Sequence, residues 1–236
     1  MQSIYEQFKS RDKKIAKQAI AGRCNGVLLD LHRTVDNQAE PVMAGEKDGL
    51  EIIRHSTAHI LAMAVKELYP DVQITIGPVI EEGFYYDFAF ADETRLTPED
   101  FPKIEKAMQK IVKKNLPIQR EEISRDDAIS YFESIGENYK AEIIRDIPQD
   151  EMLTLYDQGG FKDLCRGPHV PSTGKLGAFK LLKVAGAYWR GDSNNPMLQR
   201  VYGTAWDSKE VLDKYLEQLK EREKRNHKRI GEQADL

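Results

Sequence analysis

Hydrophobic residues recur at helical spacing between positions 52 and 68, and this is the clearest pattern in the chain. The apolar positions are Ile52, Ile53, Ile60, Met63, Ala64 and Leu68. Such spacing predicts an amphipathic helix. His55 and His59 stand four residues apart within it, so both side chains project from one face. This face offers two imidazoles that could serve as metal ligands or as bases.

Four more helices are predicted by apolar spacing or by helix-start residues, and they cover residues 3–20, 97–115, 124–136 and 207–231. Alternating or β-rich runs predict strands at residues 72–76, 84–90, 118–123, 152–156, 178–184 and 198–202. A hairpin within residues 21–31 is predicted from its Asn-Gly turn, Asn25-Gly26. This order of elements predicts a sheet with helices laid on it.

Three further features have ordinary structural interpretations. Tyr86, Phe88 and Phe90 share one face of a predicted strand, which is typical of core packing. Lys140 follows a predicted helix and, on its own, is expected to be a surface lysine. Residues 186–196 are dense in Gly, Asn and Asp, as either a binding loop or a plain turn would be.

Composition predicts a soluble globular chain in a reducing compartment. The 236 residues are 40% hydrophobic and 31% charged with a formal net charge of -4, so composition alone does not indicate a nucleic-acid binder. The two cysteines do not form a disulfide framework. No apolar run reaches the length of a membrane span, and the polar start does not resemble a signal peptide. We therefore expect a cytoplasmic protein without a membrane partner.

A second chemically useful pair, Cys165 and His169, lies in the segment Asp163-Leu-Cys-Arg-Gly-Pro-His169. Gly167 and Pro168 exclude a regular helix here and predict a shaped loop. A histidine pair alone is often an ordinary surface or core feature without a chemical role. However, three of the 5 histidines and one of the 2 cysteines fall in these two clusters, which favours a shared site. The pattern suits a tetrahedral zinc site and, equally, a metal-free hydrolytic cluster.

Several long motifs together resemble the N-terminal part of bacterial-type threonyl-tRNA synthetases, in matching order and over nearly the whole chain from about residue 14. They are His55-Ser-Thr-Ala-His59, Ile76-Gly-Pro78, Gly83-Phe-Tyr-Tyr-Asp87, Cys165-Arg-Gly-Pro-His169, Ala185-Gly-Ala-Tyr-Trp-Arg-Gly-Asp192 and Gln199-Arg-Val-Tyr-Gly-Thr-Ala-Trp206.

The resemblance implies an α+β fold of the threonyl/alanyl-tRNA synthetase editing type, an antiparallel sheet with helices packed on it. It implies a partial TGS-like β-grasp module at residues 1–47, an editing domain at 48–206 and a linker helix at 207–236 leading toward an aminoacylation core. The family's opening strand and hairpin are not found before Ser3, and its class II motifs are not found in the chain. We therefore expect no aminoacylation from this chain.

The same resemblance implies that the chain hydrolyses serine wrongly attached to threonine tRNA. Because serine lacks one methyl group of threonine, a binding pocket discriminates between them by only ~1–3 kcal/mol, so a second, hydrolytic site is needed. By resemblance, residues of the two pairs and three others line that site. They are His55, His59, Cys165 and His169, with Asp163, Lys140 and Tyr86.

The roles of these residues are hypotheses. His55, oriented by neighbours that include Asp163, would activate water, while Lys140 would stabilise negative charge or contact the ribose hydroxyl. His59, Cys165 and His169 would shape the serine pocket. The expected partners are the acceptor end of threonine tRNA carrying serine, and the aminoacylation core.

Four other interpretations of the site or of the chain remain open. Related alanyl editing domains hold zinc on the same arrangement, but we expect no cofactor because Lys140 would be repelled by a dication. A zinc-dependent deacylase of the alanyl type would act on a different tRNA. A covalent Cys165 intermediate lacks a separate base signature. Finally, the chain could be a tRNA-docking module without activity of its own.

Overall fold

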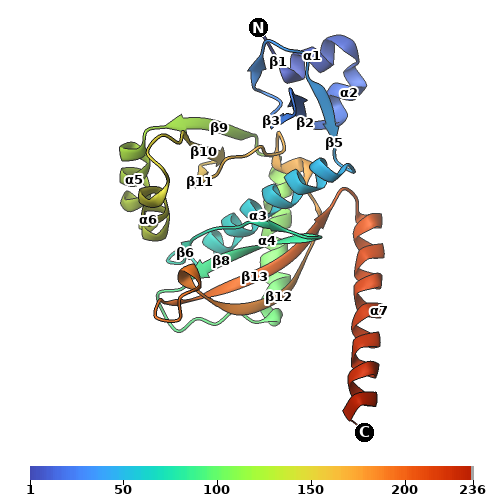
Figure 1. The fold of residues 1–236 in the computed structure, drawn as a ribbon, viewed down its shortest axis with the longest axis vertical. Coiled ribbons are helices and arrows are strands. Elements are labelled where there is room, and N and C mark those ends of the chain that lie inside the picture. The colour runs from blue at the N-terminus through green and yellow to red at the C-terminus, as the bar shows by residue number, and fades with distance from the viewer. Residues whose placement is uncertain (235–236) are drawn as a thin grey trace.

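The N-terminal unit is a small sheet covered by two short helices. The computed structural model describes residues 1–234, with side chains through residue 227. The unit comprises β1 (Gln2–Ser3), α1 (Ile4–Arg11), α2 (Lys13–Gln18), β2 (Ala19–Cys24), β3 (Val27–Leu29), β4 (Thr34–Val35) and β5 (Glu40–Met43). Strands β3, β2 and β5 form an antiparallel sheet, at the top of Figure 1. Ile4 and Phe8 of α1 are fully buried in a small core of this unit.

Local chemistry explains the start of helix α1 and the turn between β2 and β3. The Ser3 side chain caps α1 in a capping box with Glu6. Asn25 and Gly26 both have positive φ, 50° and 79°, as the predicted two-residue hairpin turn between β2 and β3 requires. Strand β5 lies in a stretch that the sequence pattern did not predict as a strand, because Pro41 and the surrounding polar residues obscure the alternation.

The central layer is a five-stranded sheet with α3 (Lys47–Leu68) and α4 (Phe101–Lys114) packed against each other. Its strands are β6 (Gln73–Ile74), β7 (Val79–Ile80), β8 (Gly83–Ala89), β12 (Ala178–Tyr188) and β13 (Met197–Trp206). All pairings are antiparallel, in the order β12-β13-β8-β6, with β7 also on β8 (Figure 1). Helix α3 is buried along most of its length because it packs against strands β8 and β13 of this sheet and against helix α4.

A second sheet of β9 (Ile118–Ile123), β10 (Leu153–Gln158) and β11 (Phe161–Leu164) carries helices α5 (Arg125–Ser134) and α6 (Asn138–Asp146). Phe132 of α5 and Ile144 of α6 pack on Leu155 of β10 in a separate core. The sequence pattern did not predict α6. It placed Lys140 on the surface, which is wrong, because the Lys140 side chain is buried.

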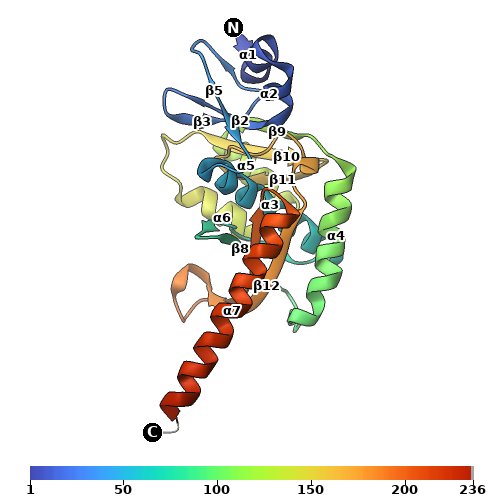
Figure 2. The ribbon, with the colours of Figure 1, turned by 90° about the vertical axis from the view of Figure 1, so that its right-hand side faces the viewer.

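Helix α7 (Lys209–Ala234) closes the described chain and extends away from the remainder (Figures 1 and 2). In its first turns the side chains of Leu212 and Tyr215 are buried, while most of its later described side chains are exposed. The α+β class with antiparallel sheets is confirmed. Among the described residues, no helix is both long and apolar enough to cross a membrane.

Candidate functional site

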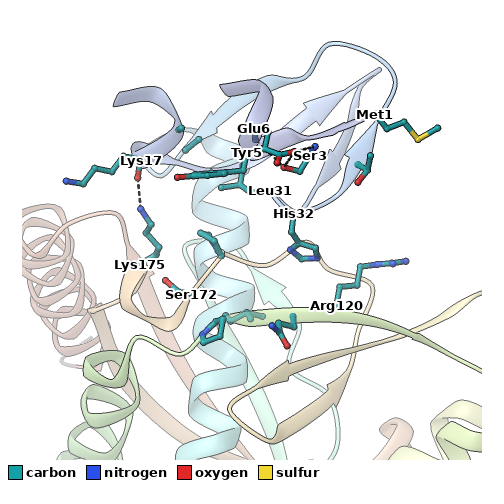
Figure 3. A pocket seen from close by; sticks show the side chains of 17 residues that line it. Met1, Ser3, Tyr5, Glu6, Lys17, Leu31, His32, Arg120, Ser172 and Lys175 are labelled. Atoms are coloured by element: carbon teal, nitrogen blue, oxygen red, sulfur yellow. Dashed lines mark hydrogen bonds between the residues drawn. The ribbon is translucent and has the colours of Figure 1, made fainter. Parts of the chain in front are cut away.

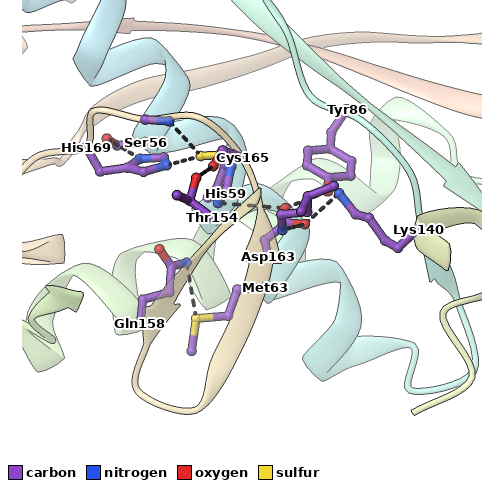
Figure 4. Close-up of polar contacts among 12 residues, drawn as sticks. Ser56, His59, Met63, Tyr86, Lys140, Thr154, Gln158, Asp163, Cys165 and His169 are labelled. Atoms are coloured by element: carbon purple, nitrogen blue, oxygen red, sulfur yellow. Dashed lines mark hydrogen bonds and ion pairs between the residues drawn. The ribbon is translucent and has the colours of Figure 1, made fainter. Parts of the chain in front are cut away.

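The two predicted pairs lie together at the centre of the molecule. His55 and His59 come from α3, whereas Cys165 and His169 come from the irregular segment after β11. One ligand-capable atom from each of the four side chains lies within 4.8 Å of the others. The His169 ring centroid is 4.4 Å from those of both His55 and His59. Residues separated by more than 100 positions thus form one cluster (Figure 4).

His169 is held in place through both of its ring nitrogens. Its Nε2 lies 2.9 Å from Cys165 Sγ and its Nδ1 lies 2.9 Å from Ser56 Oγ. Ser56 Oγ also accepts from the Val170 N–H, which ties the hydroxyl to the same segment as His169. Nδ1 faces this hydroxyl and Nε2 faces the Cys165 sulfur, so the ring tautomer decides which of the two nitrogens donates. Ser56 lies inside the predicted histidine motif, but its role could not be recognised before the two segments were placed together.

Behind the cluster, Asp163 forms a buried polar network with Lys140 and Tyr86. Lys140 Nζ lies 2.5 Å from Asp163 Oδ1, and the Tyr86 hydroxyl donates to Oδ2 at 2.8 Å (Figure 4). Burial opposes ionisation of Asp163, but the Lys140 ammonium and the hydrogen bonds outweigh it and lower the pKa of this carboxyl. The network therefore holds an ionised carboxylate paired with a lysine. Asp163 is the third residue of β11 instead of part of the predicted loop.

The Asp163 carboxylate lies 3.7 Å from Nδ1 of His59. This differs from the sequence-based expectation, which placed Asp163 beside His55. No hydrogen-bond partner within the described protein satisfies this buried nitrogen of His59. The ring of His55 instead packs on that of His169, with centroids 4.4 Å apart, and shares a cavity lining with Pro168. Of the two histidines of α3, only His59 is thus in contact with the Asp163 carboxylate, whereas both rings pack against that of His169.

All three imidazoles are neutral near pH 7. Burial is the main cause: it lowers the pKa of His59 to about 3, lowers that of His55, and lowers that of His169 well below its usual value. Burial also raises the pKa of the Cys165 thiol well above its usual value. The cluster therefore supplies neutral bases and a protonated thiol, and this favours water activation over attack by a thiolate.

A cavity of about 270 Å³ reaches His55, which is only partly buried. Its lining also includes Gly77, Pro78, Gly167 and Pro168. Gly77 is packed directly on the Tyr86 ring, since an added Cβ would lie 2.2 Å from a ring carbon. Through His55, a small ligand in this cavity reaches the cluster.

Comparison with known proteins shows what the chain is similar to. Residues 153–202 match the family described as "Threonyl and Alanyl tRNA synthetase second additional domain". The threonine–tRNA ligase of Burkholderia lata is 60% identical over 236 residues, covering 99% of this chain and 37% of that protein. The enzyme of Acidithiobacillus ferrooxidans is 62% identical over 224 residues, covering 94% of this chain and 34% of that protein. The chain matches the N-terminal region of threonine–tRNA ligases.

The resemblance to threonyl-tRNA synthetases inferred from the motifs is confirmed over nearly the whole chain. The chain spans about a third of the length of these threonine–tRNA ligases, 37% for the Burkholderia multivorans protein. The matched family segment runs from β10 to β13 and contains Asp163, Cys165 and His169, but His55, His59, Tyr86 and Lys140 lie outside it. The fold brings these latter side chains to the former.

The donor set of this cluster is compatible with zinc. His55, His59 and His169 would supply nitrogens and Cys165 sulfur, and a zinc ion held there would supply Lewis-acid activation of water. However, Cys165 Sγ and His169 Nε2 are 2.9 Å apart and already satisfy each other. Two such ligands on a tetrahedral zinc lie about 3.5 Å apart. The observed spacing suits a hydrogen-bonded cluster better than a ligand shell.

Proposed function

We propose that this chain hydrolyses the ester of a mischarged tRNA, as the editing part of a threonyl-tRNA synthetase, with seryl-tRNA(Thr) as substrate. One observation carries the proposal: a neutral, partly exposed His55 borders a small cavity and adjoins a buried cluster of neutral imidazoles. Such a group can take a proton from water near pH 7. The similarity to threonine–tRNA ligases supplies the substrate class.

In this mechanism His55 takes the proton of the attacking water. His59 and His169, whose ring centroids lie within 5.1 Å of that of His55, are almost fully buried and outside the cavity lining, so we assign them to supporting the His55 ring from the interior. Lys140 is buried and paired with Asp163, so we assign it to holding that carboxylate beside His59 instead of to direct substrate contact. Tyr86 supports the same carboxylate through its hydroxyl.

The reaction is proposed to proceed without a metal. The hydrogen bonds of Cys165 and His169 to each other, and of His169 to Ser56, satisfy these donors without an ion. The proposed partners are the acceptor end of threonine tRNA and an aminoacylation core, which would belong to the part of the longer threonine–tRNA ligases that this chain does not cover. The division into a module at 1–47, an editing domain at 48–206 and a linker helix at 207–236 is part of the proposal.

The test is deacylation by the purified chain of serine-charged and threonine-charged threonine tRNA, with and without a strong chelator. We expect serine release, threonine retention and no chelator effect. His55→Gln should lower kcat by ~10²–10⁴-fold, the range of general-base catalysis. His227→Gln, at an exposed position on α7, is the matched control and should leave the rate unchanged.

Each other outcome identifies a rival function. Release that stops in chelator would make His55, His59, Cys165 and His169 zinc ligands. Release from alanyl substrates alone would indicate an alanyl-type deacylase. Binding of tRNA with a steep salt dependence and no release would leave a docking module.

A further inference from the structure

Asp30 is a buried carboxylate that the N-terminal unit inserts beside the candidate site. It directly follows β3 and is only 4% exposed. Its Oδ1 accepts from the backbone N–H of His169 at 2.8 Å, and its Oδ2 accepts from the Tyr156 hydroxyl at 2.7 Å. Both oxygens are therefore used by residues more than 120 positions away in the chain.

Both partners of Asp30 determine the position of the His169 segment. The Tyr156 ring packs edge-on against the His169 ring, with centroids 4.5 Å apart. The same hydroxyl lies under Gly167, where an added Cβ would come within 1.9 Å of it. Asp30, Tyr156 and the backbone of residues 167–169 thus form one buried, mutually constrained group.

The contact made by Asp30 differs from general packing between the units. Elsewhere, a cavity of about 950 Å³ lies between the N-terminal unit and the start of β9, lined by Tyr5, Lys17, His32 and Arg120 among others (Figure 3). Within the described residues Asp30 forms no ion pair, so only these two hydrogen bonds offset the free-energy cost of burying its carboxylate. A buried carboxylate is costly unless it is hydrogen-bonded, and removing it would leave a buried N–H and O–H without acceptors.

We propose that Asp30 is a positioning residue for ester hydrolysis: through Tyr156 and the His169 N–H, the N-terminal unit sets the geometry of the imidazole cluster. The inference rests on the proposed function for its kinetic part. A displacement of about 1 Å in a catalytic group can cost ~10²-fold in rate. The consequence is that the N-terminal unit completes the hydrolytic site.

Asp30→Asn in the full 236-residue chain tests the inference. The amide keeps nearly the same volume and can still accept from His169, but more weakly than a carboxylate, and its NH₂ cannot accept from Tyr156. We expect kcat for serine release to fall about ten- to a hundredfold with KM changed less than about twofold. Asp36→Asn is the matched control, because it removes the same charge at an exposed position of the same unit, and its rate should be unchanged.

A second readout is independent of activity. Labelling with ¹⁵N-histidine yields amide signals from only 5 histidines, so the His169 signal can be followed directly. In Asp30→Asn this signal should move upfield, because its acceptor is weaker, while that of His227 stays in place. If Asp30→Asn fails to fold, Tyr156→Phe replaces it, and a smaller decrease in kcat in the same direction is expected.

The results separate the two proposals. An unchanged kcat in a folded Asp30→Asn, or in Tyr156→Phe when that variant decides, overturns the inference. A raised KM with all histidine signals displaced also overturns it, since it indicates general loss of structure. If the unaltered chain hydrolyses neither charged tRNA, the proposed function fails, and the His169 signal alone decides: movement supports the positioning contact and a fixed signal overturns it.

Discussion

At the scale of single residues, Lys140 shows how a partner decides the role of a charge. In sequence it is one of many lysines and is flanked by Tyr139 and Ala141. In the fold it is 2% exposed and lies 2.5 Å from Asp163, whose other oxygen accepts from Tyr86. Because each charge is buried, each depends on the other more strongly than a surface pair would.

Lys140→Met is predicted to lower the free energy of unfolding by roughly 3–5 kcal/mol, the usual cost of leaving one partner of a buried ion pair. The measurement is urea unfolding followed by circular dichroism. Lys110→Met, on the exposed face of α4, is the control and should change stability by less than about 0.5 kcal/mol. Adding Asp163→Asn to Lys140→Met should recover part of the loss, and a loss of similar size in the control would argue against the pairing.

At the scale of elements, the segment after β11 is shaped by close contacts with its neighbours. Gly167 has a φ of +66° and lies directly over the Tyr156 hydroxyl. Its backbone N–H donates to Cys165 Sγ at 3.2 Å. The position therefore requires a residue without a side chain for two reasons, backbone conformation and lack of space.

Gly167→Ala is predicted to lower both stability and the rate of ester hydrolysis, since the new methyl must displace Tyr156 or the segment itself. Gly26→Ala is the matched control: Gly26 also has a positive φ, +79°, but an added Cβ would meet nothing within 4 Å. We expect the control to lose about 1 kcal/mol from strain alone and to keep its activity. Equal effects of the two substitutions on kcat would contradict the steric account.

At the scale of the whole molecule, the N-terminal unit shares its interior with the central layer. Ile20 and Ala21 of β2 and Val42 of β5 belong to the same apolar core as α3 and β8. The Asp30 hydrogen bonds cross the same boundary. We therefore expect the unit and the central layer to unfold together.

Ile20→Ala is predicted to lower the unfolding midpoint seen by tryptophan fluorescence, although Trp189 and Trp206 both lie outside the N-terminal unit. The loss expected for a buried isoleucine is about 2–5 kcal/mol. Val27→Ala, at a 57% exposed position of the same unit, should leave the midpoint in place. A separate early transition in Ile20→Ala, seen by circular dichroism but not by fluorescence, would show that the unit unfolds alone.

Local patterns predicted much of the fold. The α3 helix, the Asn25-Gly26 hairpin, β9 and the helix starts at Pro98 and Ser124 all follow from signals within a few residues. Predictions were wrong or missing where tertiary contacts outweighed local preference. Helix α6 has weak apolar spacing and is held by packing on Phe132 and Leu155, and β12 continues to Tyr188 because β13 pairs with it there.

The sequence by itself determined which side chains could do the chemistry. Two short motifs bring together His55 with His59 and Cys165 with His169, because helical spacing and a Gly-Pro turn are local properties. Only the tertiary structure decided what surrounds them: that Lys140 is buried, that Asp163 faces His59, and that Asp30 and Tyr156 hold His169. Those relations depend on contacts between distant segments and on the burial that shifts each pKa, and neither is encoded in local spacing.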